Sequence, residues 1–136
     1  MAHCPCSNAA LGSGIFPLRR HIEKNVGVAL GTDVGGGIGF GMLKEALHAY
    51  LLQRVGPEPI TLTASQMLYL ATRAGAEAMN LADQIGDFTP GKSADFVYLR
   101  APLRDRPLRL SEILTLADSS WIKRVYVEGD SVHDAG

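Results

Sequence analysis

The sequence predicts an α/β fold made of two parts. In the first part, short β-prone segments alternate with segments whose apolar residues recur at helical spacing, which is the βαβα order of parallel sheets and barrels. In the second part, β-prone segments follow turn signals, which is typical of antiparallel strands. The composition changes near residues 81–85, so we expect a first domain over residues 1–82 and a second over 83–136.

The first part begins with strand, helix and strand. A short strand opens the chain. A helix is predicted over Phe16–Lys24, because Pro17 fits the first helical turn, where a missing amide hydrogen costs nothing. Val26–Leu30 is the second predicted strand, since its residues are apolar and β-prone.

Two longer helices follow. The first has apolar residues at helical spacing, namely Met42, Leu43, Ala46, Leu47, Tyr50 and Leu51. Gly56–Pro59 breaks the chain, and Thr63 is expected to cap a further helix that runs to about Met79.

The second part is predicted to contain antiparallel strands. Pro90 and Gly91 mark a turn, and Phe96–Leu99 and Ile122–Val127 are the predicted strands. Gly129–Asp130 is expected to form a hairpin turn that leads into a last strand at residues 131 and 132.

Composition indicates a globular protein and argues against two classes of function. Of the 136 residues, 46% are hydrophobic and 20% are charged, which is typical of a folded, soluble protein. The net charge is −1 and the basic residues are scattered, which argues against a nucleic-acid partner. The chain shows no secretory signal, and no run approaches the about 20 apolar residues of a membrane span, so no membrane partner is expected.

The cysteines point to a reducing environment. Cys4 and Cys6 are the two cysteines of the chain, and they are too close in sequence to form a relaxed disulfide. We therefore expect reduced thiols and a cytoplasmic location. Core packing is the simpler role for both residues, and a reactive thiolate pair is the alternative.

The strongest functional signal is Asp33. The run Val26–Leu30 stops just before it, so Asp33 projects at the carboxyl end of a strand, where the loops of α/β proteins build active sites. The glycines that follow, Gly35, Gly36 and Gly37, leave room for a ligand to approach the backbone. The simpler alternative is that Asp33 only closes an Asx turn or caps a helix.

The histidines do not form a metal-binding motif. Their spacing excludes both H-x-H and H-E-x-x-H. A catalytic zinc usually takes three protein ligands, and Asp33 is the one convincing candidate here. His3, at the end of a predicted strand, is expected to hold the strand-to-loop junction through its ring nitrogens, whereas His21 and His48 are expected to be solvated on helices.

Two short motifs match other kinds of site only in part. Gly86–Ser93 reads GDFTPGKS and fits the P-loop pattern G-x-x-x-x-G-K-[ST]. A P-loop needs a strand before it and a helix after it, whereas here the tail of a helix precedes and a β-prone segment follows, so we expect a turn. Pro5 and Cys6 begin the P-C-x-x-C signature of zinc cytidine deaminases, but Ala9 stands where the second cysteine is needed.

Three stretches of the sequence resemble a known family. They read AHCPCSN from Ala2, LGSGIFPLRRHIEKNVGVALGTDVGGGIGFGMLKEA from Leu11, and AEAMNLADQIGDFTPGKSADFVYL from Ala76. Together they resemble the C-terminal part of the guanine deaminase family, which belongs to the metal-dependent amidohydrolase superfamily. The resemblance covers residues 3 to about 132, and GTDVGGG at Gly31–Gly37 is its most specific piece.

This resemblance implies a (β/α)8 barrel followed by strands of a small β-sandwich. Residues 1–8 would correspond to the end of the seventh barrel strand and residues 26–33 to the eighth. A complete barrel needs at least about 200 residues, so we expect the barrel to be incomplete in this chain.

The resemblance also implies a chemistry, the conversion of guanine and water into xanthine and ammonia at a single zinc site. Asp33 would be both the metal ligand and the catalytic residue, and Gly35, Gly36 and Gly37 would shape the loop beside the purine substrate. The family's histidine ligands have no counterpart here, so the remaining zinc ligands would be absent from this chain, and the chain alone is expected to be inactive. The complete enzyme is expected to be a homodimer.

Two alternatives stay open. One is another purine or triazine deaminase, or a chlorohydrolase, of the same superfamily, since these share the aspartate and related motifs. The other is a non-catalytic, truncated remnant. Asn8 and Ser13, in loops at the same end of the barrel, are further candidates to support the site.

Overall fold

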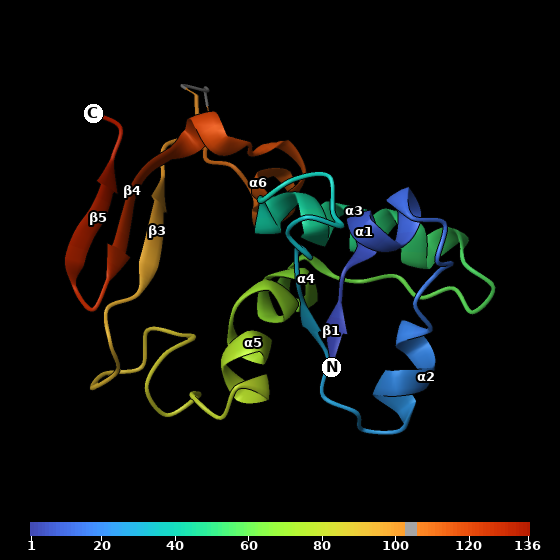
Figure 1. Ribbon diagram of the computed structural model, residues 1–136. Helices are drawn as coiled ribbons and strands as arrows, with labels where there is room; N and C mark the ends of the chain where they lie inside the picture. Colours follow the sequence, from blue (N-terminus) through green and yellow to red (C-terminus); the bar gives the residue numbers. More distant parts are fainter. Residues whose placement is uncertain (103–105) are drawn as a thin grey trace.

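The computed structural model describes residues 1–102 and 106–136. Its elements, in chain order, are β1 (Ala2–His3), α1 (Pro5–Ala10), α2 (Leu18–Glu23), β2 (Ala29–Leu30), α3 (Met42–Val55), α4 (Ala64–Ala71), α5 (Arg73–Ala78), β3 (Phe96–Leu99), α6 (Leu110–Leu116), the 3₁₀ helix η1 (Ser119–Trp121), β4 (Ile122–Val127) and β5 (Asp130–Asp134). Figure 1 shows β1 and β2 among helices on one side of the molecule and a separate sheet of β3, β4 and β5 on the other. The predicted α/β class is confirmed, and the described residues form no closed barrel.

The two predicted strands of the first part form a parallel sheet. Ala2 lies opposite Ala29, and His3 lies opposite Leu30. The chain between the strands passes through α1 and α2, because parallel strands need a crossover connection. The second strand is shorter than predicted, since its partner β1 is only two residues long. β1 ends there because Pro5 has no amide hydrogen for a ladder and instead begins α1.

The helices predicted before the second sheet are present with shifted ends, whereas α1 was not predicted. α2 begins at Leu18, because Pro17 is the N-cap residue and does not lie in the first turn. α3 ends at Val55, immediately before the predicted break at Gly56. Among the described residues, no helix is both long and apolar enough to cross a membrane.

The predicted helix from Thr63 to about Met79 is divided into α4 and α5. Thr63 caps α4 as predicted, because its hydroxyl accepts a hydrogen bond from the Gln66 amide and the Gln66 side chain accepts one from the Thr63 amide. The division lies at Thr72, whose φ of −132° and ψ of −92° are not helical. The Thr72 hydroxyl donates to the Leu68 carbonyl at 2.7 Å, a local bond of the kind that often bends helices.

The hydrophobic core lies between the β1–β2 sheet and the helices. Leu18 of α2 and Leu114 of α6 are its largest fully buried apolar side chains. α6, which packs against α3 and α4, was not among the predicted elements. A seven-residue helix is too short to show a clear helical period. Residues from the second half of the chain therefore help to complete the core of the first half.

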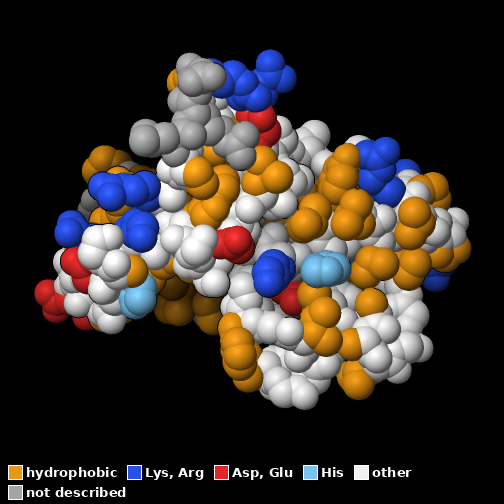
Figure 2. Space-filling view, turned by 90° about the horizontal axis from the view of Figure 1, so that it is seen from above, with side chains coloured by type: hydrophobic (Ala, Val, Ile, Leu, Met, Phe, Trp, Pro, Cys, Tyr) orange, Lys and Arg blue, Asp and Glu red, His pale blue; other side chains and the backbone are white. Residues whose placement is uncertain are grey.

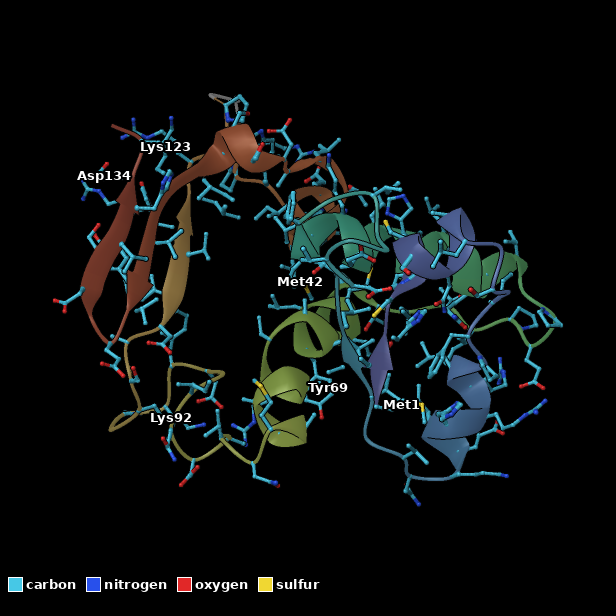
Figure 3. The ribbon with its side chains drawn as sticks, viewed as in Figure 1. Met1, Met42, Tyr69, Lys92, Lys123 and Asp134 are labelled. Carbon is cyan, nitrogen blue, oxygen red and sulfur yellow. The ribbon has the colours of Figure 1, made fainter. Side chains whose placement is uncertain are left out.

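The second sheet is antiparallel, in the order β3–β4–β5. Its first two strands have the predicted bounds. Phe96 lies opposite Tyr126, and the two rings stack with 4.5 Å between their centroids. Figure 3 shows Lys123 and Asp134 at one end of this sheet and Lys92 on the chain beyond the other end.

The hairpin turn between β4 and β5 lies one residue earlier than predicted. Glu128 and Gly129 have positive φ values of 53° and 86°, as the central residues of a two-residue hairpin turn require. Asp130, which was predicted to be in the turn, already pairs with Val127.

Candidate active site

The carboxyl ends of β1 and β2 bring together the polar residues of the first half of the chain. β1 leads into α1, which contains Cys6 and Ser7, and β2 leads into the loop that contains Asp33. Figure 2 looks onto this end of the strands and shows an acidic, a basic and a histidine side chain together among hydrophobic ones. In proteins built on parallel strands, this edge is the usual place for an active site.

Asp33 is held in a tight turn. Its backbone has a φ of 49°, a left-handed conformation that Asp adopts more readily than most other residues. Its carbonyl oxygen accepts hydrogen bonds from the amides of Gly36, at 2.9 Å, and Gly37, at 2.6 Å. Its carboxylate oxygen Oδ2 accepts a hydrogen bond from the Ser7 hydroxyl at 2.5 Å. The carboxylate is therefore fixed through one oxygen, although Asp33 is exposed to solvent.

The glycines after Asp33 have different structural roles. Gly35 has a φ of 100°, and a Cβ atom added there would have no neighbouring atom within 4 Å, so the backbone conformation alone favours glycine. A Cβ atom at Gly36 would lie 2.6 Å from Oδ2 of Asp33, and one at Gly37 would lie 2.1 Å from the carbonyl oxygen of Thr32. At Gly36 and Gly37, the space that a side chain would need is therefore occupied by atoms of Asp33 and Thr32, and not left open for a ligand. The missing side chains allow the loop to pack closely around the Asp33 carboxylate.

Ser7, which was not among the predicted site residues, is the residue that supports Asp33. It is 2% exposed and donates to Asp33, whereas the expected candidates Asn8 and Ser13 make no such contact among the described residues. Ser7 and Asp33 both follow the end of a parallel strand. That shared position was the signal that could have identified the pair.

Glu45 is a second buried polar residue that was not predicted. It lies in the first turn of α3, is 1% exposed, and accepts a hydrogen bond from the Cys6 amide at 3.0 Å. This bond ties the start of α1 to the start of α3, next to the Asp33 loop.

Both cysteines are free thiols, as predicted. Burial, together with the hydrogen bond and the charge of Glu45, raises the pKa of Cys6 to about 12. Burial, followed by the charges of Asp33 and Glu45, also raises the pKa of Cys4. Because the thiolate is the reactive and metal-binding form, these shifts argue against a thiolate pair and favour core packing.

His21 and His48 are not simply solvated, so that prediction is wrong. His21 stacks on Phe16 with 4.5 Å between the ring centroids. Nδ1 of His48 lies 2.7 Å from the Lys44 carbonyl oxygen and 3.0 Å from Sγ of Cys6. A carbonyl oxygen can only accept, so the contact with Lys44 places the proton on Nδ1.

His3 has a structural role, as predicted, but packing holds it more than its ring nitrogens do. It is 1% exposed and stacks on Phe16 with 4.7 Å between the ring centroids. Its Nε2 has one long contact of 3.5 Å, with Gln53, and its Nδ1 has no hydrogen-bond partner among the described residues. Burial lowers the pKa of His3 to about 4, so the ring is neutral near pH 7.

The low pKa of His3 predicts an acid-dependent stability. The imidazole takes up a proton near pH 6.5 in the unfolded chain but only near pH 4 in the folded protein, so the unfolded state binds more protons between these values. The free energy of unfolding should therefore fall as the pH is lowered through this range and level off below it. Urea unfolding at several pH values measures the effect. In His3→Gln, the free energy of unfolding should depend less on pH between about 4 and 6.5. An unchanged dependence in that variant would contradict the assignment of the effect to His3.

The segment Gly86–Ser93 forms turns and bends, and a strand, β3, follows it instead of a helix, which confirms that the P-loop match is accidental. Nζ of Lys92 lies 3.0 Å from the Asp87 carboxylate and also donates to the Ala82 carbonyl. Asp87 pairs in addition with Arg73 of α5. Lys92 thus fastens the segment to the helices before it, and its side chain is only 9% exposed.

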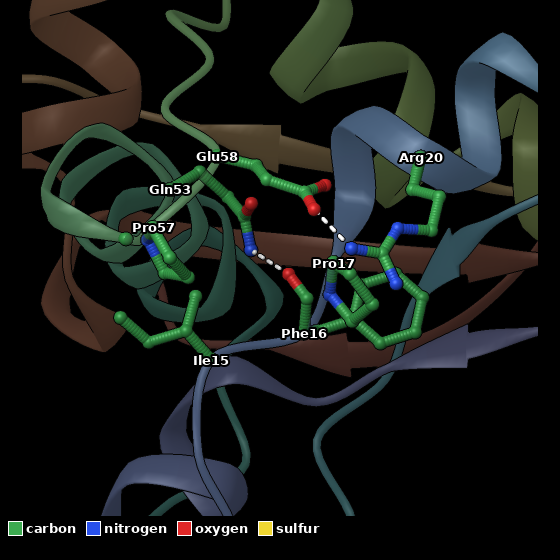
Figure 4. A pocket seen from close by; sticks show the side chains of 8 residues that line it. Ile15, Phe16, Pro17, Arg20, Gln53, Pro57 and Glu58 are labelled. Carbon is green, nitrogen blue, oxygen red and sulfur yellow. Dashed lines mark hydrogen bonds and ion pairs between the residues drawn. The ribbon is translucent and has the colours of Figure 1, made fainter.

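Two small cavities lie away from Asp33. One, of about 80 Å³, is shown in Figure 4, where Gln53 donates to the Phe16 carbonyl at 2.8 Å and Arg20 pairs with Glu58. The other, of about 170 Å³, is bordered by Met1 and Tyr69, among others. Neither is lined by the Asp33 loop.

A metal site in this region can be only partly built from the described residues. No three His, Cys, Asp or Glu side chains in residues 1–102 and 106–136 are grouped so that they could hold a metal ion. Asp33 fits such a site as a single ligand, because its second oxygen, Oδ1, has no side-chain partner in the described part of the chain. Carboxylate oxygen is an accepted zinc ligand.

A carboxylate at the carboxyl end of a parallel strand, followed by a tight glycine loop, defines the class of α/β enzymes whose active sites lie at strand ends. Within that class, the model of the amidohydrolase family matches residues 1–132. The chain belongs to the amidohydrolase family.

Individual relatives support the guanine deaminase resemblance. The chain is 49% identical over 144 residues to a probable guanine deaminase of Deinococcus radiodurans, covering 97% of this chain and 33% of the relative. The structure of E. coli guanine deaminase superimposes with a TM-score of 0.90 at 39% identity, over 99% of this chain and 34% of that one. A zinc-bound adenosine deaminase of Xanthomonas campestris gives a TM-score of 0.85 at 30% identity, over 96% of this chain and 31% of that one. The chain therefore spans about a third of the length of these relatives.

Proposed function

We propose that the full-length protein that carries this chain converts guanine and water into xanthine and ammonia. The observation that carries the proposal is the geometry of Asp33, whose carboxylate is held at Oδ2 and has no side-chain partner at Oδ1 among the described residues. The choice of guanine is supported by the 49% identity to the probable guanine deaminase of Deinococcus radiodurans.

In this reaction Asp33 would serve as a zinc ligand and as the proton carrier. When bound, zinc would lower the pKa of a water molecule, so that hydroxide forms near neutral pH. Asp33 would accept the proton of that water and return it to the exocyclic amino group, which then leaves as ammonia. Gly35, Gly36 and Gly37 would shape the loop beside the purine, with Gly35 leaving open space on its outer side.

The rest of the assembly is proposed from the family. Further zinc ligands would come from residues outside this chain, since zinc usually takes three protein ligands. Residues 1–82 would form the last strand–helix units of the barrel and residues 83–136 part of the β-sandwich. The complete enzyme would be a cytoplasmic homodimer.

The test is an assay of the full-length protein with guanine. We expect xanthine and ammonia to appear in equal amounts, activity to be lost after treatment with a chelator, and activity to return when zinc is added. The 136-residue chain assayed alone is expected to be inactive. A zinc-loaded full-length protein that leaves guanine unchanged would refute the proposal.

A second candidate is the deamination of an adenine-containing compound, which the similarity to the Xanthomonas campestris adenosine deaminase favours. The same assay with adenosine separates the two, because inosine would then form in place of xanthine. If neither substrate reacts, a triazine substrate or a non-catalytic remnant becomes the better interpretation.

A further inference from the structure

We infer that Ser7 is a positioning residue that fixes the orientation of the Asp33 carboxylate for the reaction. The inference rests on the proposed function, because it assigns a task to each oxygen of the proposed catalytic carboxylate. Oδ2 accepts the Ser7 hydrogen bond, which would leave Oδ1 free to bind the metal.

The contact between Ser7 and Asp33 is specific and sheltered. The Ser7 hydroxyl donates to Oδ2 at 2.5 Å, within the range of a charge-assisted O–H···O⁻ bond. Ser7 is 2% exposed, so water cannot easily replace it as the donor. A hydrogen bond to an ionised group contributes more than one between neutral groups.

The glycine loop closes Oδ2 from another side. A Cβ atom at Gly36 would lie 2.6 Å from Oδ2 of Asp33 and 3.3 Å from Oγ of Ser7. The absence of a side chain at Gly36 therefore lets the backbone pack directly over the Ser7–Asp33 bond. Oδ2 is enclosed by Ser7 and Gly36, whereas Asp33 as a whole is exposed, so Oδ1 is the oxygen left available.

Ser7 itself is held by the framework around it. Its carbonyl oxygen accepts a hydrogen bond from the Leu11 amide at 2.9 Å. The neighbouring Cys6 amide donates to the buried carboxylate of Glu45 in α3. The position of Ser7 is thus set by α1 and α3, and Asp33, on an exposed loop, takes its orientation from that framework.

Removing the donor should impair turnover more than substrate binding. Without the hydroxyl, the Asp33 carboxylate can turn away from its present orientation, so fewer molecules hold a free carboxylate oxygen in the reactive position. Loss of a partner that orients a metal ligand typically costs about 10- to 100-fold in activity or metal affinity. The KM for guanine should change little, because Ser7 is buried and so has almost no surface to offer a substrate.

The experiment compares Ser7→Ala, Ser7→Cys and the control Ser13→Ala in the zinc-loaded, full-length protein. Ser13 lies in the exposed loop between α1 and α2, so its substitution removes the same hydroxyl without touching Asp33. We expect kcat to fall about 10- to 100-fold in Ser7→Ala and less in Ser7→Cys, whose thiol is a weak donor of nearly the same shape. Zinc retention against a chelator should fall in the same order, and Ser13→Ala should match the parent.

Two outcomes would overturn the inference while leaving the proposed function intact. One is a Ser7→Ala variant with the parent's kcat and zinc retention. The other is a loss of kcat that follows a loss of thermal stability equally in Ser7→Ala and Ser7→Cys, which would make Ser7 only a packing residue. If the unmodified protein does not deaminate guanine, the proposed function fails instead, and zinc retention in the three variants still tests the role of Ser7.

Discussion

Asp33→Asn in the full-length protein is expected to lower the rate of guanine deamination by about 10²- to 10⁴-fold, which is the usual cost of losing a general base. The fold should survive, because Asn has nearly the same shape and also adopts the left-handed conformation that Asp33 has here, with φ of 49°. Its amide oxygen can still accept the Ser7 hydrogen bond. It cannot accept the proton of the attacking water, and it is a weaker metal ligand.

This substitution distinguishes catalysis from local structure. If Asp33 only stabilised its turn, Asn would replace it almost fully, since both residues suit such turns. Steady-state kinetics on guanine with saturating zinc provide the measurement, and circular dichroism controls for the fold. A rate within a few-fold of the parent would leave Asp33 as a turn residue and remove the basis of the proposed mechanism.

Gly37→Ala is the second change with a large expected effect, a loss of about 100-fold in kcat/KM, which is what a displacement of about 1 Å in a catalytic group can cost. The added Cβ would lie 2.1 Å from the Thr32 carbonyl oxygen, and backbone atoms cannot move aside as a flexible side chain can. The turn would have to open, and the hydrogen bond from the Gly37 amide to the Asp33 carbonyl would be lost.

Gly39→Ala is the matched control for this prediction. Gly39 lies in the same loop and has no positive φ, and a Cβ atom added there would have no neighbouring atom within 4 Å. Its substitution should therefore leave kcat/KM close to that of the parent. Equal losses in the two variants would show that the loop responds to any side chain, and not to the close approach at Gly37.

The sequence predicted the strands and most of the longer helices, because these depend on local pattern, and it proposed Asp33 as the central residue of the site. Asp33 stands where an apolar run stops before glycines, and the strands β3 and β4 were predicted with the bounds they have. The sequence could not reveal the pairing of Ser7 with Asp33, which joins residues 26 positions apart through the parallel arrangement of β1 and β2.

Other differences also arise from packing and backbone geometry. The length of β2 depends on its partner strand, and α6 depends on burial of Leu114 against α3 and α4. The division between α4 and α5 at Thr72 accompanies the hydrogen bond from the Thr72 hydroxyl to the Leu68 carbonyl. The spacing of apolar residues in the sequence gives no sign of such a bond. The roles of Gly36 and Gly37 depend on which atoms lie next to them. The sequence indicated a need for space at these positions, but it could not indicate that atoms of Asp33 and Thr32 occupy that space.

The buried side chain of Lys92, in the Gly86–Ser93 segment, makes the substitutions that are tolerated at positions 87 and 92 depend on each other. Lys92 balances the charge of Asp87, which is shared with Arg73. A lineage that replaced Lys92 with a neutral residue would leave Asp87 with less compensation, and one that replaced Asp87 would leave a sheltered ammonium group facing only a carbonyl oxygen. Each replacement is thus easier to tolerate after the other has occurred, so residues 87 and 92 should change together and not singly.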